Sequence, residues 1–140
     1  ALHSQRPSLP EELSAAQSLI DLHLDDVLMN IPSIQSSTNI YGVAGTVSAT
    51  SMIEQGLYEY NFDSVHRHIM KKQDIEEVFR LLATDNREGR LSNPGMEEGR
   101  ADVIVGGLCI LAQIMRKLDF EQIQVSESDI LDGVILSLMK

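Results

Sequence analysis

The chain has 140 residues and an apolar content of 43%, which suits one folded domain and excludes a disordered chain. Its net charge of −10 argues against direct DNA or RNA binding, because phosphate backbones are bound by basic patches and only Arg67, Lys71 and Lys72 cluster. No apolar run reaches the ~18 residues of a membrane span, and no secretory signal is evident. We therefore expect a cytoplasmic protein with neither a membrane nor a nucleic-acid partner.

The first part of the chain predicts a long helix, a strand and a second helix. Ser8 to Glu12 places a proline and two acids where a helix begins, and apolar residues then recur at helical spacing until Asn30. Residues 38–44 are typical of a short buried strand. Gly45 then starts a helix that Gly56 ends.

The rest of the chain continues the alternation of strands and helices. The predicted elements are a short strand at 65–70, a helix at 72–85, an irregular stretch at 86–95, a long helix at 99–118, a strand at 120–125 and a final helix at 129–139. Ser126 with Asp129 has the spacing of a capping box before that last helix. This order predicts an α/β fold with a small sheet of about three strands packed by helices.

The turn from Gly42 to Thr46 joins the first predicted strand to its helix. Glycines at such a turn let a phosphate approach the backbone, and the helix N-terminus supplies N–H donors. We therefore take Gly42, Gly45 and Thr46 as candidate phosphate- or nucleotide-binding residues. An ordinary tight turn capped by Thr46 is the alternative, and the turn lacks the Gly-Lys-Ser/Thr sequence of a Walker A loop.

Arg100 stands at the entry to the long apolar helix. A guanidinium there can bind a phosphate through two parallel hydrogen bonds, which makes Arg100 a candidate phosphate-binding residue. The alternative is an exposed ion pair with Glu97, Glu98 or Asp102, which would add little stability.

The remaining reactive side chains predict no catalytic residue and no metal ligand in this chain. His66 and His68 alternate on the predicted strand and so share a face, but no third ligand accompanies them. We expect them to be exposed polar positions. Cys109 is the single cysteine, and its apolar surroundings predict a buried, reduced thiol.

Four segments in register resemble the second domain of the exopolyphosphatase and guanosine pentaphosphate phosphohydrolase (Ppx/GppA) family, in its short two-domain form. The matching segments are Tyr41 to Ala49, Glu59 to Asn61 followed by Val65-His66, Gly99 to Ile104 with Gly106, and Val125 to Gly133. They keep the family's order and intervals across nearly the whole chain. One departure is Ala44, which replaces the first of two adjacent glycines and narrows the approach of a ligand.

The resemblance implies one lobe of the actin, hexokinase and Hsp70 type of ATPase, a ribonuclease H-like fold. Residues 1–140 would form the second lobe as a single domain, and the first lobe would be absent from this chain. The intact enzyme would hydrolyse a terminal phosphate of polyphosphate or guanosine pentaphosphate (pppGpp) in the cleft between the lobes. The catalytic glutamate would lie in the missing lobe. That lobe would also supply most of the contacts to a magnesium-type ion.

The resemblance also implies where each candidate residue lies relative to the ligand. The turn from Gly42 to Thr46 would face the phosphate or nucleotide, and Arg100 would face the cleft. We expect the isolated chain to be inactive. Two alternatives stay open, a non-catalytic guanosine tetra- or pentaphosphate sensor and a lobe whose acidic surface forms a homodimer.

Overall fold

A three-stranded mixed sheet lies at the centre of the computed structural model, which describes residues 5–128 and 130–139. Its strand order is β1-β3-β2, formed by β1 (Tyr41–Gly42), β2 (Ile69–Lys71) and β3 (Gln122–Val125). The central strand β3 pairs in parallel with β1 and antiparallel with β2. The α/β prediction with about three strands is confirmed.

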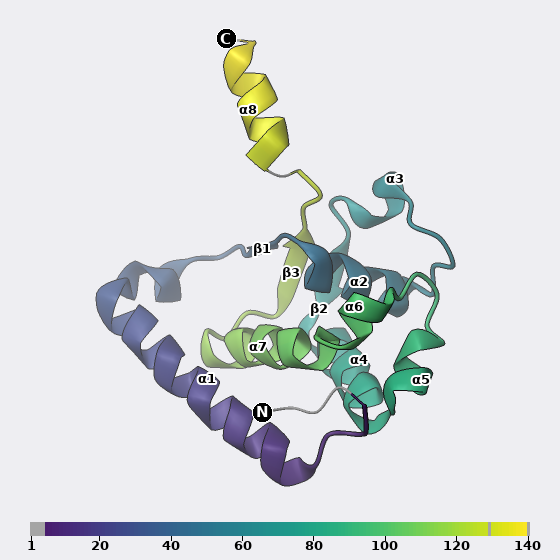
Figure 1. Cartoon of the computed structure of the whole chain (residues 1–140). Coiled ribbons are helices and arrows are strands. Elements are labelled where there is room, and N and C mark those ends of the chain that lie inside the picture. Colours follow the sequence, from purple (N-terminus) through teal and green to yellow (C-terminus); the bar gives the residue numbers. More distant parts are fainter. Residues whose placement is uncertain (1–4, 129, 140) are drawn as a thin grey trace.

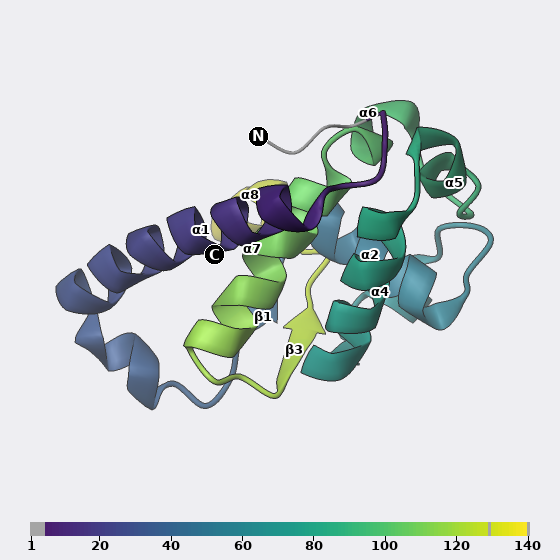
Figure 2. The same ribbon diagram turned by 90° about the horizontal axis from the view of Figure 1, so that it is seen from below.

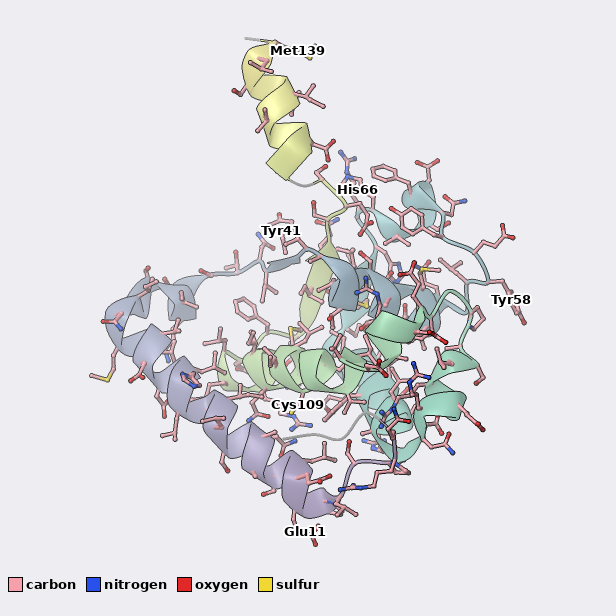
Figure 3. All side chains as sticks on the ribbon, viewed as in Figure 1. Glu11, Tyr41, Tyr58, His66, Cys109 and Met139 are labelled. Atoms are coloured by element: carbon pink, nitrogen blue, oxygen red, sulfur yellow. The ribbon has the colours of Figure 1, made fainter. Side chains whose placement is uncertain are left out.

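One face of this sheet is buried and the other is open. Met70, Ile123 and Val125 point into the core, whereas Tyr41 on the opposite face is 63% exposed and is labelled in Figure 3. Gly42 also belongs to the buried face, since a Cβ there would lie 2.7 Å from Ile123 Cδ1. Only glycine fits at that position without a shift of its neighbours.

Helices cover the buried face of the sheet. The helix α7 (Ile104–Lys117) packs between α4 (Lys72–Thr84) and α1 (Pro10–Asn30), while α2 (Gly45–Gln55) contacts both α4 and α7 (Figures 1 and 2). These helices and strands share one core of fully buried apolar side chains. Its largest members are Val65, Met70, Ile75, Leu82, Ile104, Leu108, Met115, Ile123 and Val125.

The remaining elements are short, except for the last helix. They are a 3-10 helix at Pro32–Ser36, α3 (Phe62–Val65), α5 (Arg87–Leu91), α6 (Glu98–Ala101) and α8 (Ile130–Leu138). Figure 1 shows α8 projecting away from the body of the molecule. No helix in the described part of the chain is long and apolar enough to span a membrane.

Several helix boundaries agree with the sequence prediction. The N-terminus of α1 carries Pro10 in its first turn, and Glu12 accepts a hydrogen bond from the Leu9 N–H (3.0 Å). Gly56 ends α2 in the left-handed conformation with φ +69°, as expected for a glycine after a helix. The helix predicted at 72–85 is α4.

Other predicted elements were wrong. The strand expected at 65–70 begins only at Ile69, and a helical turn, α3, precedes it. The irregular stretch at 86–95 contains α5. The single helix expected at 99–118 is two helices, because the chain breaks at Asp102 and Val103 between α6 and α7. The capping box of Ser126 with Asp129 lies partly outside the described residues.

Candidate functional site

The guanidinium of Arg100 lies directly against the backbone of Gly45. Gly45 is the first residue of α2, and Arg100 reaches it from α6. A Cβ on Gly45 would overlap the guanidinium atoms of Arg100, so this approach requires glycine. Two candidate residues that are 55 positions apart in sequence therefore share one site.

The environment of Arg100 suits an anion. The first turn of α2 contains no acidic residue, and Ala44 provides no side-chain cap for its N–H groups. A cation beside the positive end of a helix is unfavourable by itself, and an anion between them would be attracted by both. Arg100 is only partly exposed, and within residues 5–128 and 130–139 its guanidinium has no hydrogen-bond or ion-pair partner.

The alternative prediction, an ion pair of Arg100 with Glu97, Glu98 or Asp102, is wrong for the described residues. Asp102 instead accepts a hydrogen bond from Arg87 Nε at 2.8 Å. This pair lies beside the break between α6 and α7, and the hydrogen bond raises the pKa of Arg87. Because Asp102 is engaged elsewhere, it leaves Arg100 available to a ligand.

Gly42 and Thr46 lie on the far side of the turn from this space. Gly42 faces the core, as described above, and the Thr46 side chain packs against α7. A Cβ on Gly107 would lie 2.6 Å from Thr46 Oγ1, so a close contact between two helices fixes this hydroxyl. The structure therefore brings Gly45 and Arg100 together, and only the backbone N–H of Thr46 belongs to the exposed start of the helix. Phosphate contact by these residues stays a prediction.

Ala44, the residue before α2, has a backbone conformation that glycine favours. Its φ is +75° and its ψ is 179°. An L-residue in this region is strained by about 1–3 kcal/mol. The departure from the family pattern noted in the sequence thus falls at a position where the backbone still has the glycine geometry.

A pocket of about 590 Å³ opens beside Gly45 and Arg100. Its other walls combine apolar and acidic side chains from separate elements. They include Met52, Tyr60, Met96, Glu97 and Glu127. Sequence reasoning missed these residues as a group, because only the fold brings α2, the loop before α3, the loop before α6 and the end of β3 together. The one signal available was that Tyr60 and Glu127 fall within the family-like segments.

Glu127 is the most strongly held side chain of this pocket. Its carboxylate accepts hydrogen bonds from the hydroxyls of Ser48 and Tyr60, the latter at 2.7 Å. The hydrogen bond to Glu127 raises the pKa of Tyr60 to about 12. The Glu127 N–H donates to Nδ1 of His66 at 3.0 Å, and the His66 ring stacks on Phe62 with centroids 4.9 Å apart.

The two histidines do not share a strand face, contrary to the sequence prediction. His66 follows α3 and lies beside the segment that leads to α8 (Figure 3), whereas His68 Nε2 pairs with Glu54 at 2.7 Å. Both are partly buried. Each histidine thus contacts a different segment: His66 binds the backbone at Glu127, and His68 binds Glu54 in α2.

The described residues do not form a metal site. No group of three or more His, Cys, Asp or Glu in the described part of the chain could hold an ion. In the pocket, Glu127 already accepts two hydroxyl hydrogen bonds. The described residues therefore do not by themselves fit the magnesium-type ion that the resemblance implies.

Cys109 is buried in α7, as predicted. Its side chain is 1% exposed, and burial raises the pKa of the thiol. A protonated, inaccessible thiol is a poor nucleophile.

Comparison with known proteins identifies what this chain is similar to. The model of the Ppx/GppA phosphatase family matches residues 2–140. Exopolyphosphatase 2 of Mycobacterium tuberculosis is 35% identical over 141 residues, covering 98% of this chain and 44% of that protein. The chain thus spans less than half the length of the curated relative that it matches.

Solved structures show the same fold. An exopolyphosphatase-like protein superposes with a TM-score of 0.89 at 23% identity, covering 97% of this chain and 45% of that one. A Ppx/GppA phosphatase of Aquifex aeolicus gives 0.83 at 21% identity, covering 99% and 45%. The predicted α/β fold of the actin-like ATPase type is confirmed.

Proposed function

Because the chain belongs to the Ppx/GppA phosphatase family, we propose that it is the C-terminal lobe of an enzyme that hydrolyses the terminal phosphate of polyphosphate or pppGpp. In this proposal the ligand lies in a cleft between this lobe and a first lobe. The start of α2 and Arg100 form this lobe's side of the cleft. Water attacks the terminal phosphoryl group, and a glutamate of the first lobe orients or deprotonates that water.

The contact between Arg100 and Gly45 carries the proposal. An arginine without a partner among the described residues lies against an uncapped helix N-terminus. Both groups stabilise negative charge, and phosphoryl transfer depends mainly on positioning and on such stabilisation. Both residues line a pocket of about 590 Å³, which leaves room for a chain of phosphates.

The rest of the machinery is assigned to the first lobe. A carboxylate that activates water and a magnesium-type ion are required by the proposal, and this chain supplies neither from the residues described. The ion would add positive charge near the transferring phosphate. The proposed enzyme therefore works only when both lobes are present.

A nucleotide ligand is supported by a separate observation. Met52, Met96 and Tyr60 give the pocket apolar surface, and the carboxylates of Glu97 and Glu127, which are hydrogen-bond acceptors, also line it. Bare polyphosphate has no group that matches these residues, whereas pppGpp has a base and a ribose with donors. The same pocket would serve a sensor that binds guanosine tetra- or pentaphosphate without hydrolysis.

Binding of inorganic tripolyphosphate to the 140-residue chain tests the phosphate site. Calorimetry on wild type and on Arg100→Gln should show at least about a tenfold loss in the variant, since a charge-assisted contact is removed. Arg80→Gln removes the same charge from the exposed face of α4 and should bind as wild type does. Equal affinity of all three proteins would refute the site.

Hydrolysis separates the enzyme from its alternatives. We expect no phosphate release from polyphosphate by the 140-residue chain, and release by a protein that contains both lobes. If residues 1–140 alone release phosphate and Arg100→Ala abolishes this release, the assignment of the catalytic residues to the first lobe is refuted. Nucleotide binding without hydrolysis by the two-lobe protein would favour the sensor, and a dimer without affinity for either ligand, seen by light scattering, would favour the structural alternative.

A further inference from the structure

Glu127 is held in the pocket from three directions. Its backbone N–H donates to His66 Nδ1, and its two carboxylate oxygens accept from the hydroxyls of Ser48 and Tyr60. Ser48 lies in α2 three residues after Gly45, so one turn of helix separates it from the Arg100 contact. Glu127 therefore has a fixed place in the same pocket as Arg100.

The charge of Glu127 is not neutralised by these partners. Both carboxylate contacts come from neutral hydroxyls, and no Lys or Arg among the described residues pairs with it. The hydrogen bond raises the pKa of Tyr60, so the phenol keeps its proton beside the carboxylate. An anion that is only partly exposed and has no counter-ion repels other anions over several ångströms.

The pocket thus contains groups of opposite charge. Gly45 and Arg100 line it together with Tyr60 and the carboxylates of Glu97 and Glu127. We infer that Glu127 is a specificity-determining residue, whose carboxylate keeps phosphate away from the Tyr60 side and confines it to the Arg100 side. The inference rests on the proposed function, because it assigns a role within the same pocket.

This arrangement fixes the orientation of a bound ligand. A phosphate group gains charge-assisted contacts at Arg100 and meets repulsion at Glu127. The part of the ligand next to Glu127 must be neutral or must donate a hydrogen bond, since a carboxylate can only accept. A ligand that is negative along its whole length can use only one side of the pocket, and removal of the repulsion should let it bind more tightly.

Three variants separate the charge of Glu127 from its structural contacts. Glu127→Gln removes the charge and keeps an oxygen for the hydroxyls. Tyr60→Phe removes a hydrogen bond and keeps the charge. Glu59→Gln removes a charge from an exposed neighbour of Tyr60 that does not line the pocket. Calorimetry with inorganic tripolyphosphate gives the affinity of each 140-residue protein.

We expect Glu127→Gln to bind tripolyphosphate about fivefold more tightly than wild type, because one nearby negative charge is lost. Glu59→Gln should stay within about twofold of wild type, since its exposed charge lies outside the pocket. Tyr60→Phe keeps the charge of Glu127 and so should not gain the affinity that Glu127→Gln gains. An unchanged or weaker affinity of Glu127→Gln would overturn the inference. An equal gain in Tyr60→Phe would also overturn it, because the contacts and not the charge would then matter.

Chemical-shift mapping of the wild-type protein tests the same point without a variant. Tripolyphosphate should shift the Gly45 amide and the Arg100 side-chain resonances and leave the Tyr60 ring unchanged. Equal shifts at Tyr60 would contradict confinement to the Arg100 side. If Arg100→Gln binds as wild type does, the proposed function fails and this inference fails with it. If Arg100→Gln loses binding while Glu127→Gln gains nothing, only the role of Glu127 is refuted.

Discussion

Arg90 binds the backbone of Arg6, 84 residues earlier in the chain. The Arg90 guanidinium is 1% exposed, and it donates to the carbonyl of Arg6 at 3.1 Å and to the carbonyl of Leu82 at 2.8 Å. Burial lowers the pKa of Arg90, although Asp85 and Asp102 act in the opposite direction. One side chain of α5 thereby fastens the segment before α1 to the end of α4.

Replacement of this arginine should destabilise the protein strongly. Arg90→Ala leaves two carbonyls without their donor and a cavity where the arginine side chain was. We therefore expect the free energy of unfolding to fall by about 3 kcal/mol. Urea unfolding measures this loss. Arg80→Ala on the exposed face of α4 is the matched control and should cost less than about 0.5 kcal/mol. Similar midpoints for both variants would show that the buried contacts add nothing.

The strained backbone at Ala44 predicts a stabilising substitution. Ala44→Gly removes the Cβ where φ is +75°, and the free energy of unfolding should rise by about 1 kcal/mol. Ala49→Gly is the control, because the same change inside α2 should lower it by about 1 kcal/mol. Thermal unfolding of both variants compares the two positions. A fall for Ala44→Gly would mean that the turn has no strain to relieve.

The contact of Gly45 with Arg100 predicts a loss of ligand binding without a loss of fold. Gly45→Ala places a methyl group where the guanidinium lies, so Arg100 must move away from the start of α2. We expect at least about a tenfold loss of tripolyphosphate affinity. Gly99→Ala is the matched change, since nothing lies within 4 Å of its Cβ position, and it should bind normally. Normal binding by both variants would show that the contact of Gly45 with Arg100 does not contribute to tripolyphosphate binding.

The Tyr60 phenol predicts a pH dependence of stability. Its folded-state pKa, raised to about 12 by Glu127, exceeds the ordinary value of 10.0. The stability from this contact is therefore fully present below pH 10 and lost as the pH rises towards 12. The difference in unfolding free energy between wild type and Tyr60→Phe should shrink over this interval. A difference that stays constant from pH 9 to pH 12 would show that the phenol titrates alike in both states.

The family resemblance implied that the turn containing Gly45 and Arg100 both face the ligand, but nothing in the sequence predicted that the two residues are in contact. Spacing placed one at a turn and the other at a helix entry, and their contact depends on the break at Asp102 and Val103. Neither Asp102 nor Val103 is a proline or glycine, so the sequence carries no local signal for the break. The side chain of Asp102 accepts a hydrogen bond from Arg87. Contacts between distant segments set this geometry, and a local pattern does not contain them.

The strand prediction at 65–70 failed for a local reason. Asn61 Oδ1 accepts from the N–H groups of Asp63 and Ser64, at 2.9 and 3.3 Å, and so caps the short helix α3. The capping signal was present, but the sequence prediction assigned residues 65–70 to a strand. In contrast, α2 and α4 were predicted well. Glycines mark both ends of α2, and α4 has an apolar face formed by Ile75, Val78, Phe79 and Leu82.

The projecting helix α8 gives the molecule a region of much lower local stability. In this helix Val134, Ile135, Leu136 and Leu138 are all exposed, so little burial supports the part of it from residue 132 onward. A helix of this length is marginal in water without packing. Its amides should exchange with deuterium within the shortest labelling times, while those of α7 should exchange only when the whole fold opens. Equal protection of α7 and α8 would show that the last helix unfolds together with the core.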